Sequence, residues 1–176
     1  MRLIQSFGEI ITVAEKILIA CYSRTGTTRK VAGELAKILK ADVEEIIDTK
    51  NRSGALGYIL AGRDAMSGKL TVIKPAQKNP RDYALVVVGT PVWAWTAAPA
   101  ARTYILQNKA ALKKVAFFCT RGGDGSARAL KALEDACGRK PVAVLALKTS
   151  EITGGSYVEQ VKEFARKLGK ALRKAA

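Results

Sequence analysis

A short run of hydroxyl and cationic residues, Ser23 to Thr28, carries the most specific chemistry in the chain. It reads Ser23, Arg24, Thr25, Gly26, Thr27, Thr28 and stands between a buried apolar run, Ile17 to Cys21, and a helical pattern. The start of a helix leaves backbone N–H groups without partners and carries the positive end of the helix dipole. Hydroxyl donors, an Arg and a Gly that permits close approach reinforce this, so the segment predicts a phosphate-binding loop.

Two other loops with unusual residues also follow predicted strands. The second loop is Thr90, Pro91, Val92, Trp93, Ala94, Trp95, and the third is Thr120, Arg121, Gly122, Gly123, Asp124. Ligands of open α/β sheets bind beyond the carboxyl ends of the strands, so we expect the three loops to meet. Trp offers a large stacking face, and in an extended loop the two Trp should point the same way. The set fits a flat, phosphorylated aromatic ligand; the alternatives are that the Trp anchor the loop in the core and that the third loop is only a turn.

The elements that position these loops are predicted from apolar runs that alternate with helical patterns. This alternation is typical of an α/β fold with a doubly wound, five-stranded parallel sheet between two layers of helices. Strands are expected at 17–21, 43–47, 84–88, 115–119 and 142–147. Five helices are expected: one to about Lys40, one that ends near Gly68, one with Pro99 in its first turn, one that ends at about Cys137, and a last one that starts near Ser156. Ser156 and Glu159 have the spacing of a capping box. The third strand should be central and end at Gly89, and the second, with Glu44 and Glu45, should lie at an edge.

Composition limits the class of protein. The chain has 176 residues, of which 48% are hydrophobic and 26% are charged. This composition predicts one globular domain and excludes a disordered chain, and no apolar run approaches the length of a bilayer span. The first fifteen residues lack a clear cleavage-site pattern, so we expect no signal peptide and a cytoplasmic location.

Cysteine and histidine usage excludes several kinds of chemistry. Cys21, Cys119 and Cys137 form no CxxC pair, which argues against a disulfide framework or a zinc site, and no metal ligand set is predicted. Two of the three lie in predicted strands and are expected in the core. The chain has no His, so Ser23 lacks the usual general base and no catalytic residue is assigned. We expect the Ser23 hydroxyl to form a hydrogen bond at the helix start instead.

The charge of the chain is strongly positive. Thirty Lys and Arg against fifteen Asp and Glu leave a formal charge of +15, which attracts anionic partners. Part of the excess belongs to the last helix and is interpreted there as a solvated face: Lys162, Arg166, Lys167, Lys170, Arg173 and Lys174. Composition alone leaves open a phosphate-bearing ligand, an acidic protein and nucleic acid.

The three loops together resemble those of the flavodoxin-like family, whose members hold flavin mononucleotide (FMN). Ser23 to Thr28 is similar to the family's phosphate loop, Gly89 to Trp93 to the segment that stacks on the flavin ring, and Gly122 to Asp124 to the turn at its pyrimidine edge. The resemblance covers about residues 16–171. It implies a strand order of 2-1-3-4-5. Strand five runs into the last helix through only Lys148 to Gly155, so the long insertion of the larger members is missing and the chain resembles the short-chain type. P-loop and dinucleotide-binding patterns are absent.

The chain departs from the family in the third loop and in charge. Family carriers often have a Tyr after the third-loop Asp, whereas Gly125, Ser126 and Ala127 follow Asp124 here. Either Trp95 substitutes or that flavin face is open to a nicotinamide or quinone. Family carriers are also usually acidic. Cations near the ring, with Arg121 first and Arg63 second, should raise the reduction potential of this chain's flavin.

The resemblance therefore predicts an FMN-binding protein in electron transfer, in which the flavin carries the redox chemistry. An NAD(P)H-dependent flavin or quinone reductase is the alternative, and if the protein is an enzyme it is an FMN-dependent oxidoreductase. The second alternative is a non-redox domain that binds an acidic protein or nucleic acid. Expected partners are a redox protein or a small-molecule electron donor or acceptor, with an acidic partner allowed by the charge; nucleic acid is not favoured, and association into a homo-oligomer is left open.

The first fifteen residues are not explained by the resemblance. We divide the chain into an N-terminal extension, residues 1–15, and a flavodoxin-like domain, residues 16–176. Leu3, Ile4, Phe7, Ile10 and Ile11 have helical spacing, so the extension is either an amphipathic helix that packs on the sheet or on a second subunit, or a disordered start.

Overall fold

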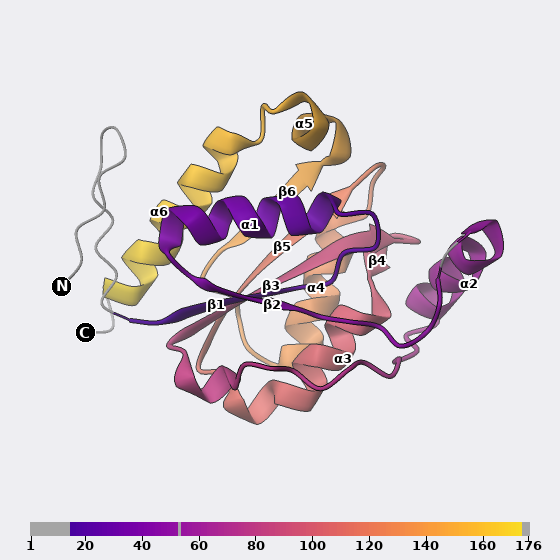
Figure 1. Cartoon of the computed structure of the whole chain (residues 1–176), viewed down its shortest axis with the longest axis horizontal. Helices are drawn as coiled ribbons and strands as arrows, with labels where there is room; N and C mark the ends of the chain where they lie inside the picture. Colours follow the sequence, from indigo (N-terminus) through magenta and orange to yellow (C-terminus); the bar gives the residue numbers. More distant parts are fainter. Residues whose placement is uncertain (1–14, 53, 174–176) are drawn as a thin grey trace.

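The computed structural model describes residues 15–52 and 54–173, in which a sheet lies between two layers of helices (Figure 1). The strands are β1 (Ile17–Cys21), β2 (Asp42–Glu45), β3 (Leu85–Trp93), β4 (Thr96–Ala97), β5 (Lys114–Arg121) and β6 (Val144–Lys148). The helices are α1 (Thr27–Leu39), α2 (Gly54–Met66), α3 (Pro99–Asn108), α4 (Ser126–Cys137), α5 (Thr149–Gly154) and α6 (Val158–Arg173). Short 3-10 turns span Pro80–Asp82 and Lys109–Ala111. Residues 1–14 of the proposed extension and Lys174 lie outside the described residues.

The order of the parallel strands is β2-β1-β3-β5-β6, and β4 pairs antiparallel with β3. Leaving out the two-residue strand β4, this is the order 2-1-3-4-5, so the predicted α/β fold is confirmed. The second strand lies at the edge as predicted. There, the buried Glu44 carboxylate accepts the backbone N–H groups of Gln77 and Lys78. A charged group in an edge strand is stable because the neighbouring chain supplies its hydrogen bonds.

The core divides between the two faces of the sheet because successive side chains of a strand point to opposite sides. α1 and α6 cover one face, where Val31, Leu35 and Phe164 pack on Ile19 and Val87. α3 and α4 cover the other face, where an equivalent apolar layer packs on the alternate residues of the same strands. The central strands are therefore apolar on both sides, as the β-branched run of β3 predicted.

The structure corrects the ends of several predicted elements. β3 does not end at Gly89 but continues to Trp93, where it turns into β4 and forms a hairpin. β5 and β6 reach Arg121 and Lys148, beyond the predicted ends. The predicted capping box at α6 is wrong, because the Ser156 hydroxyl donates to the Glu151 carbonyl oxygen and Glu159 pairs with Lys162. A cap of this kind stands instead at the start of α5, where the Glu151 carboxylate accepts the backbone N–H of Lys148.

Candidate functional site

The loop between β1 and α1 has the geometry of an anion site. Gly26 precedes the helix with a φ of 90°, a conformation that glycine adopts at little cost, and no side chain caps the helix. The first helical hydrogen bond runs from the N–H of Lys30 to the carbonyl of Gly26, so the N–H groups before Lys30 lie outside the ladder. The first turn has no acidic residue. These donors and the helix dipole favour a bound anion.

The hydroxyl groups of this loop have different tasks. Among the described residues, the buried Ser23 Oγ has no hydrogen-bond partner, so the expectation that it bonds at the helix start is wrong. Thr25 and Thr27 share a hydrogen bond of 3.3 Å between their Oγ1 atoms. The Oγ1 of Thr28 lies 2.8 Å from that of Thr120, a buried contact that ties the first loop to the third. A buried hydroxyl without a partner is costly, so Ser23 is suited to a ligand oxygen.

Trp93 stands at the centre of a cluster of cations and aromatics. Its ring meets Tyr22 edge-on, with centroids 5.4 Å apart and planes at 86°. The guanidinium carbons of Arg24 and Arg52 lie 5.9 Å and 5.7 Å from the ring centroid. Burial raises the pKa of Tyr22 to about 12, so its phenol stays neutral. The ring of Trp93 is held by its neighbours and is only partly buried.

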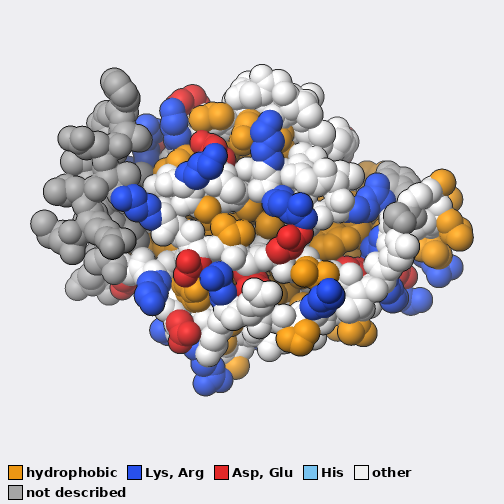
Figure 2. Space-filling view, in the orientation of Figure 1, with side chains coloured by type: hydrophobic (Ala, Val, Ile, Leu, Met, Phe, Trp, Pro, Cys, Tyr) orange, Lys and Arg blue, Asp and Glu red, His pale blue; other side chains and the backbone are white. Residues whose placement is uncertain are grey.

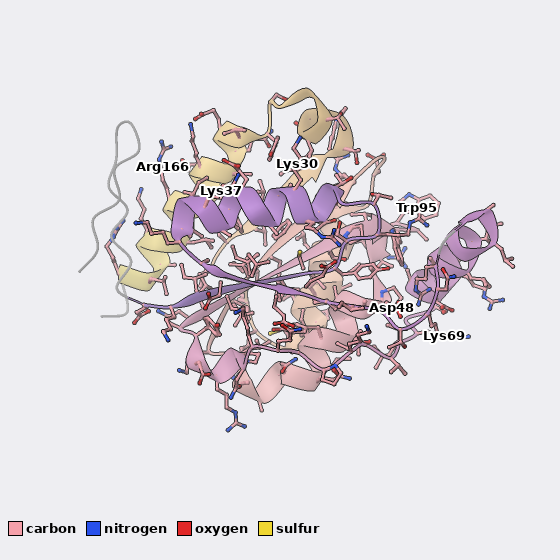
Figure 3. All side chains as sticks on the ribbon, viewed as in Figure 1. Lys30, Lys37, Asp48, Lys69, Trp95 and Arg166 are labelled. Atoms are coloured by element: carbon pink, nitrogen blue, oxygen red, sulfur yellow. The ribbon has the colours of Figure 1, made fainter. Side chains whose placement is uncertain are left out.

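Trp95 lies in a tight turn and not in an extended loop. Ala94 and Trp95 have φ values of 44° and 63° and form the two-residue connection between β3 and β4. Two positive φ values are typical of the hairpin turn whose twist matches the strands. The argument that an extended loop points both Trp the same way is therefore wrong. The Trp95 side chain is 59% exposed and lies on the side of the sheet that faces α2 (Figure 3).

The third loop closes against this turn. A Cβ atom on Gly125 would lie 2.5 Å from the Cα of Trp95, so the two backbones touch. Arg121 donates from Nη1 to the carbonyl of Gly123 at 2.8 Å, and its Nη1 lies 3.8 Å from the exposed Asp124 carboxylate. Arg121 therefore shapes its own loop, and Asp124 contributes a turn residue.

The three loops and α2 enclose a cleft of about 540 Å³, which is within the range of small-molecule sites. Eleven predicted site residues line it: Arg24, Thr25, Thr27, Thr28, Pro91, Val92, Trp93, Ala94, Trp95, Thr120 and Gly122. Six do not: Ser23, Gly26, Thr90, Arg121, Gly123 and Asp124. Of these, Thr90 is fully buried, and its hydroxyl accepts the N–H of Ala98 inside the hairpin.

Further cleft residues were not predicted as site residues. They are Ile59, Ala61, Gly62, Arg63 and Met66 of α2, and Thr149 after β6. Thr149 follows the carboxyl end of a strand, so the rule that selected the other loops also applies to it. Of the α2 residues only Arg63 was expected near the ring, because of its charge; the others have no comparable signal, because only the tertiary fold brings this helix to the cleft.

A buried ion-pair network anchors α2 beside the cleft. Arg52 donates from Nε to Asp48 at 2.6 Å and from Nη1 to Asp64 at 3.1 Å. All three side chains are at most 9% exposed. Although burial opposes ionisation of Asp64, the hydrogen bond from Arg52 and the nearby Lys50 hold its pKa below the ordinary value. Because one partner left alone would be a buried charge, the network ties the segment that precedes α2 to the last turn of the helix.

The cysteines do not take part in this chemistry. Cys21, Cys119 and Cys137 are free and buried. Burial raises the pKa of the Cys21 and Cys119 thiols to about 12. Since the thiolate is the reactive form, both act as small core side chains, as predicted. Among the described residues, no helix is both long and apolar enough to cross a membrane.

Comparison with known proteins identifies the family. Residues 16–164, most of the chain, match a family model described as flavodoxin. The chain belongs to the flavodoxin family. The family match includes all three loops that form the cleft and most of the helices that cover the sheet. No curated protein matches the chain.

Solved structures of other flavodoxin-like proteins share the fold. A flavoprotein in complex with FMN from Lactobacillus acidophilus NCFM is 22% identical, with a TM-score of 0.67 over 85% of this chain and 99% of that one. Flavodoxin 2 from Bacillus cereus, in its oxidised form, is 16% identical, with a TM-score of 0.57 over 89% and 99%. A flavodoxin, WrbA-like protein from Agrobacterium tumefaciens is 13% identical, with a TM-score of 0.59 over 92% and 99%. At identities of 13% to 22%, these likenesses show that the fold is shared and do not extend to function.

Proposed function

We propose that the protein binds FMN in the cleft and acts in electron transfer. The observation that carries this proposal is that the cleft joins an anion-binding helix start to two Trp side chains at one end of the sheet. The Ser23 hydroxyl, which has no hydrogen-bond partner among the described residues, lies in the same loop as the helix start. Membership of the flavodoxin family and the FMN named for the Lactobacillus acidophilus flavoprotein support it. The donors fit a phosphate and the cleft fits a flat ring, so the residues present suit FMN.

We assign the phosphate to Ser23–Thr28, one side of the ring to Thr90–Trp95 and its edge to Thr120–Asp124. Bound FMN supplies the redox chemistry, by accepting and releasing electrons. The chain's own residues hold the phosphate, orient the ring and set the charge around it. Arg24 lies against Trp93 and lines the cleft, so we assign its guanidinium to the phosphate end of the site.

Charge near the ring is expected to favour the reduced, anionic flavin. Arg63 lines the cleft, whereas Arg121 is bonded to its own loop, so the order of the two predicted cations is reversed. Exposed charges act over about 8 to 10 Å at ordinary ionic strength, which restricts the effect to groups at the cleft. Of the two predicted cations, Arg63 is therefore the one that we propose acts on the ring; Arg24 also lines the cleft, where we assign it to the phosphate.

A specific observation favours an NAD(P)H-dependent reductase as the second candidate. The third loop continues with Gly125, Ser126 and Ala127, so it offers no aromatic cover, and Trp95 is more than half exposed. A nicotinamide or quinone can then reach one face of the ring. Steady NAD(P)H oxidation with a quinone by the purified protein supports the reductase, and its absence supports the carrier.

The decisive experiment is the visible spectrum of the purified protein, followed by titration of the apoprotein with FMN and with riboflavin, which lacks the phosphate. If the first loop holds the phosphate, FMN binds at least tenfold more tightly, because a charge-assisted hydrogen bond contributes about 1.5 to 3 kcal/mol. A colourless protein that also refuses FMN refutes the proposal. Salt-sensitive nucleic-acid binding without flavin uptake would then support the non-redox alternative.

A further inference from the structure

Helix α2 faces the protein with its small residues. Gly57, Ala61 and Ala65 are buried, and a Cβ atom on Gly57 would lie 2.5 Å from the backbone of Arg52. Asp64 on the same side joins the ion-pair network. A surface helix ordinarily buries its large apolar side chains, so this orientation is the reverse of the usual one.

The opposite side of α2 presents large apolar side chains to solvent. We call Leu56, Ile59, Leu60, Arg63 and Met66 the outer stripe of α2; its four apolar residues are 71%, 65%, 38% and 57% exposed. Figure 2 shows orange side chains along the outer edge of this helix, with blue Lys and Arg beside them. A contiguous exposed apolar surface of this kind marks an interaction site.

The outer stripe has no part in anchoring the helix. Arg52 ties the segment before the helix to Asp64 in its last turn, and Arg102 donates from Nη2 to the carbonyls of Ala65 in that turn and of Lys69 just after the helix. The stripe is continuous with the cleft, because Ile59, Arg63 and Met66 belong to both. Whatever covers the stripe therefore comes within reach of the proposed flavin ring.

The surroundings of the outer stripe are positively charged. Residues 50–74 contain four exposed Lys and Arg (Lys50, Arg63, Lys69 and Lys74); the fifth, Arg52, is buried and pairs with Asp64, the one acidic residue of the segment. Asp64 is buried and paired, so it offers no negative charge to a partner. Lys69 lies below α2 in Figure 3, on the same side of the molecule as Trp95. The surface thus has an apolar centre with a basic rim.

We propose that the outer stripe of α2 and its basic rim dock an acidic redox protein, which exchanges electrons with the flavin through the adjacent cleft. This inference rests on the proposed function. A second copy of the chain does not fit, because its own basic rim and charge of +15 repel the first. A lipid surface fits less well, because Arg63 lies within the apolar stripe, where a protein partner can supply a carboxylate and acyl chains cannot.

The test measures binding of two haem proteins of opposite charge, the acidic haem domain of cytochrome b5 and basic cytochrome c, to the FMN-loaded protein by calorimetry. We expect at least tenfold tighter binding of the acidic probe at low salt, and loss of this preference at 1 M NaCl, where the screening length is about 3 Å. Bound FMN that an added chemical reductant has fully reduced would supply two electrons, one to each of two ferric haems, and its protons would pass to water. Equal affinity for the two probes would overturn the proposal.

Two sets of variants separate the apolar centre from the rim. Leu56→Ser with Leu60→Ser should weaken binding of cytochrome b5 about tenfold, whereas Leu106→Ser with Val144→Ser, at side chains 42% and 48% exposed elsewhere, should not. The double variant Lys69→Gln with Lys74→Gln should also weaken binding of cytochrome b5. The control is Lys113→Gln with Lys140→Gln, which changes the net charge equally at exposed residues that precede β5 and β6 and should leave the affinity unchanged.

Three other outcomes are informative. An unchanged affinity in the Leu56 and Leu60 double variant refutes docking on the stripe. If that variant loses binding to phosphatidylserine vesicles but still binds cytochrome b5, the surface binds lipid. If the variant converts a dimer to a monomer, the surface binds a second copy of the chain. Either result overturns the proposal. Titration with FMN distinguishes failure of the docking proposal from failure of the proposed function. If the protein binds FMN but does not prefer the acidic probe, only the docking proposal is refuted; if it binds no FMN, the proposed function is refuted.

Discussion

Gly125 is the position at which one added methyl group should disturb both the fold and the cleft. Its φ is 107°, and a Cβ atom there would lie 2.5 Å from the Cα and 3.0 Å from the carbonyl carbon of Trp95. A left-handed conformation costs a residue with a side chain roughly 1 to 2 kcal/mol. Displacing packed neighbours costs about 1 to 3 kcal/mol more. We expect Gly125→Ala to lower the free energy of unfolding by about 3 kcal/mol.

Urea unfolding of the apoprotein measures this loss, and thermal unfolding should show a fall in Tm of about 6 to 12 °C for a chain of this size. Gly123→Ala is the matched control in the same loop, because no atom lies within 4 Å of its added Cβ and its backbone is not left-handed. We expect the control to change stability by less than about 0.5 kcal/mol. Equal stability of the two variants would refute the proposed contact between the third loop and the hairpin turn.

Other predictions concern the ligand, the thiols and the charges. Ser23→Ala should weaken FMN about tenfold in a fluorescence titration and leave riboflavin unchanged; an equal loss for both would contradict the phosphate assignment. Cys21 and Cys119 should resist a disulfide reagent at pH 8 until the protein unfolds, because their pKa values are about 12. Because the pKa of Asp64 is lower in the folded protein than in the unfolded chain, where it is about 3.9, ionised Asp64 stabilises the fold above that pH, and this stability is lost as the pH falls further. Asp64→Asn should therefore flatten the acid side of a plot of the free energy of unfolding against pH. Arg63→Gln should lower the two-electron potential of bound flavin by about 10 to 20 mV in a redox titration, since an exposed charge contributes ~1 kcal/mol or less and 1.4 kcal/mol corresponds to about 30 mV; an unchanged potential would exclude it.

The fold was predictable because its main signals are local. The continuous apolar runs identified the parallel strands, and the acidic pair Glu44 and Glu45 identified an edge. The end of the third strand was not predictable in this way, because Gly89 and Pro91 are turn signals in isolation. In the structure the strand continues through both, and the Thr90 hydroxyl and pairing with β4 hold it in place.

The candidate site was partly predictable from the rule that loops at the carboxyl ends of strands converge. The rule placed residues of all three loops on the cleft, although whether they bind FMN stays a prediction. It could not assign tasks within the loops. Thr28 and Thr120 bond to each other across 92 positions of sequence, and Ser23 is left without a partner in the described residues. Such a division depends on tertiary contacts, which residue types alone do not specify.

Helix α2 shows why the remaining part of the site was out of reach. The spacing of Leu56, Ile59, Leu60 and Met66 predicts a helix but not the side that faces inward. Two requirements decide this: Gly57 must approach the backbone of Arg52, and Asp64 must reach the Arg52 guanidinium. Both lie on the side away from the large apolar residues, so satisfying a buried charge turns those residues outward. The apolar surface beside the cleft is therefore a consequence of how α2 is anchored, and a substitution that releases the anchor, such as Arg52→Met, should disturb the cleft and the docking surface together.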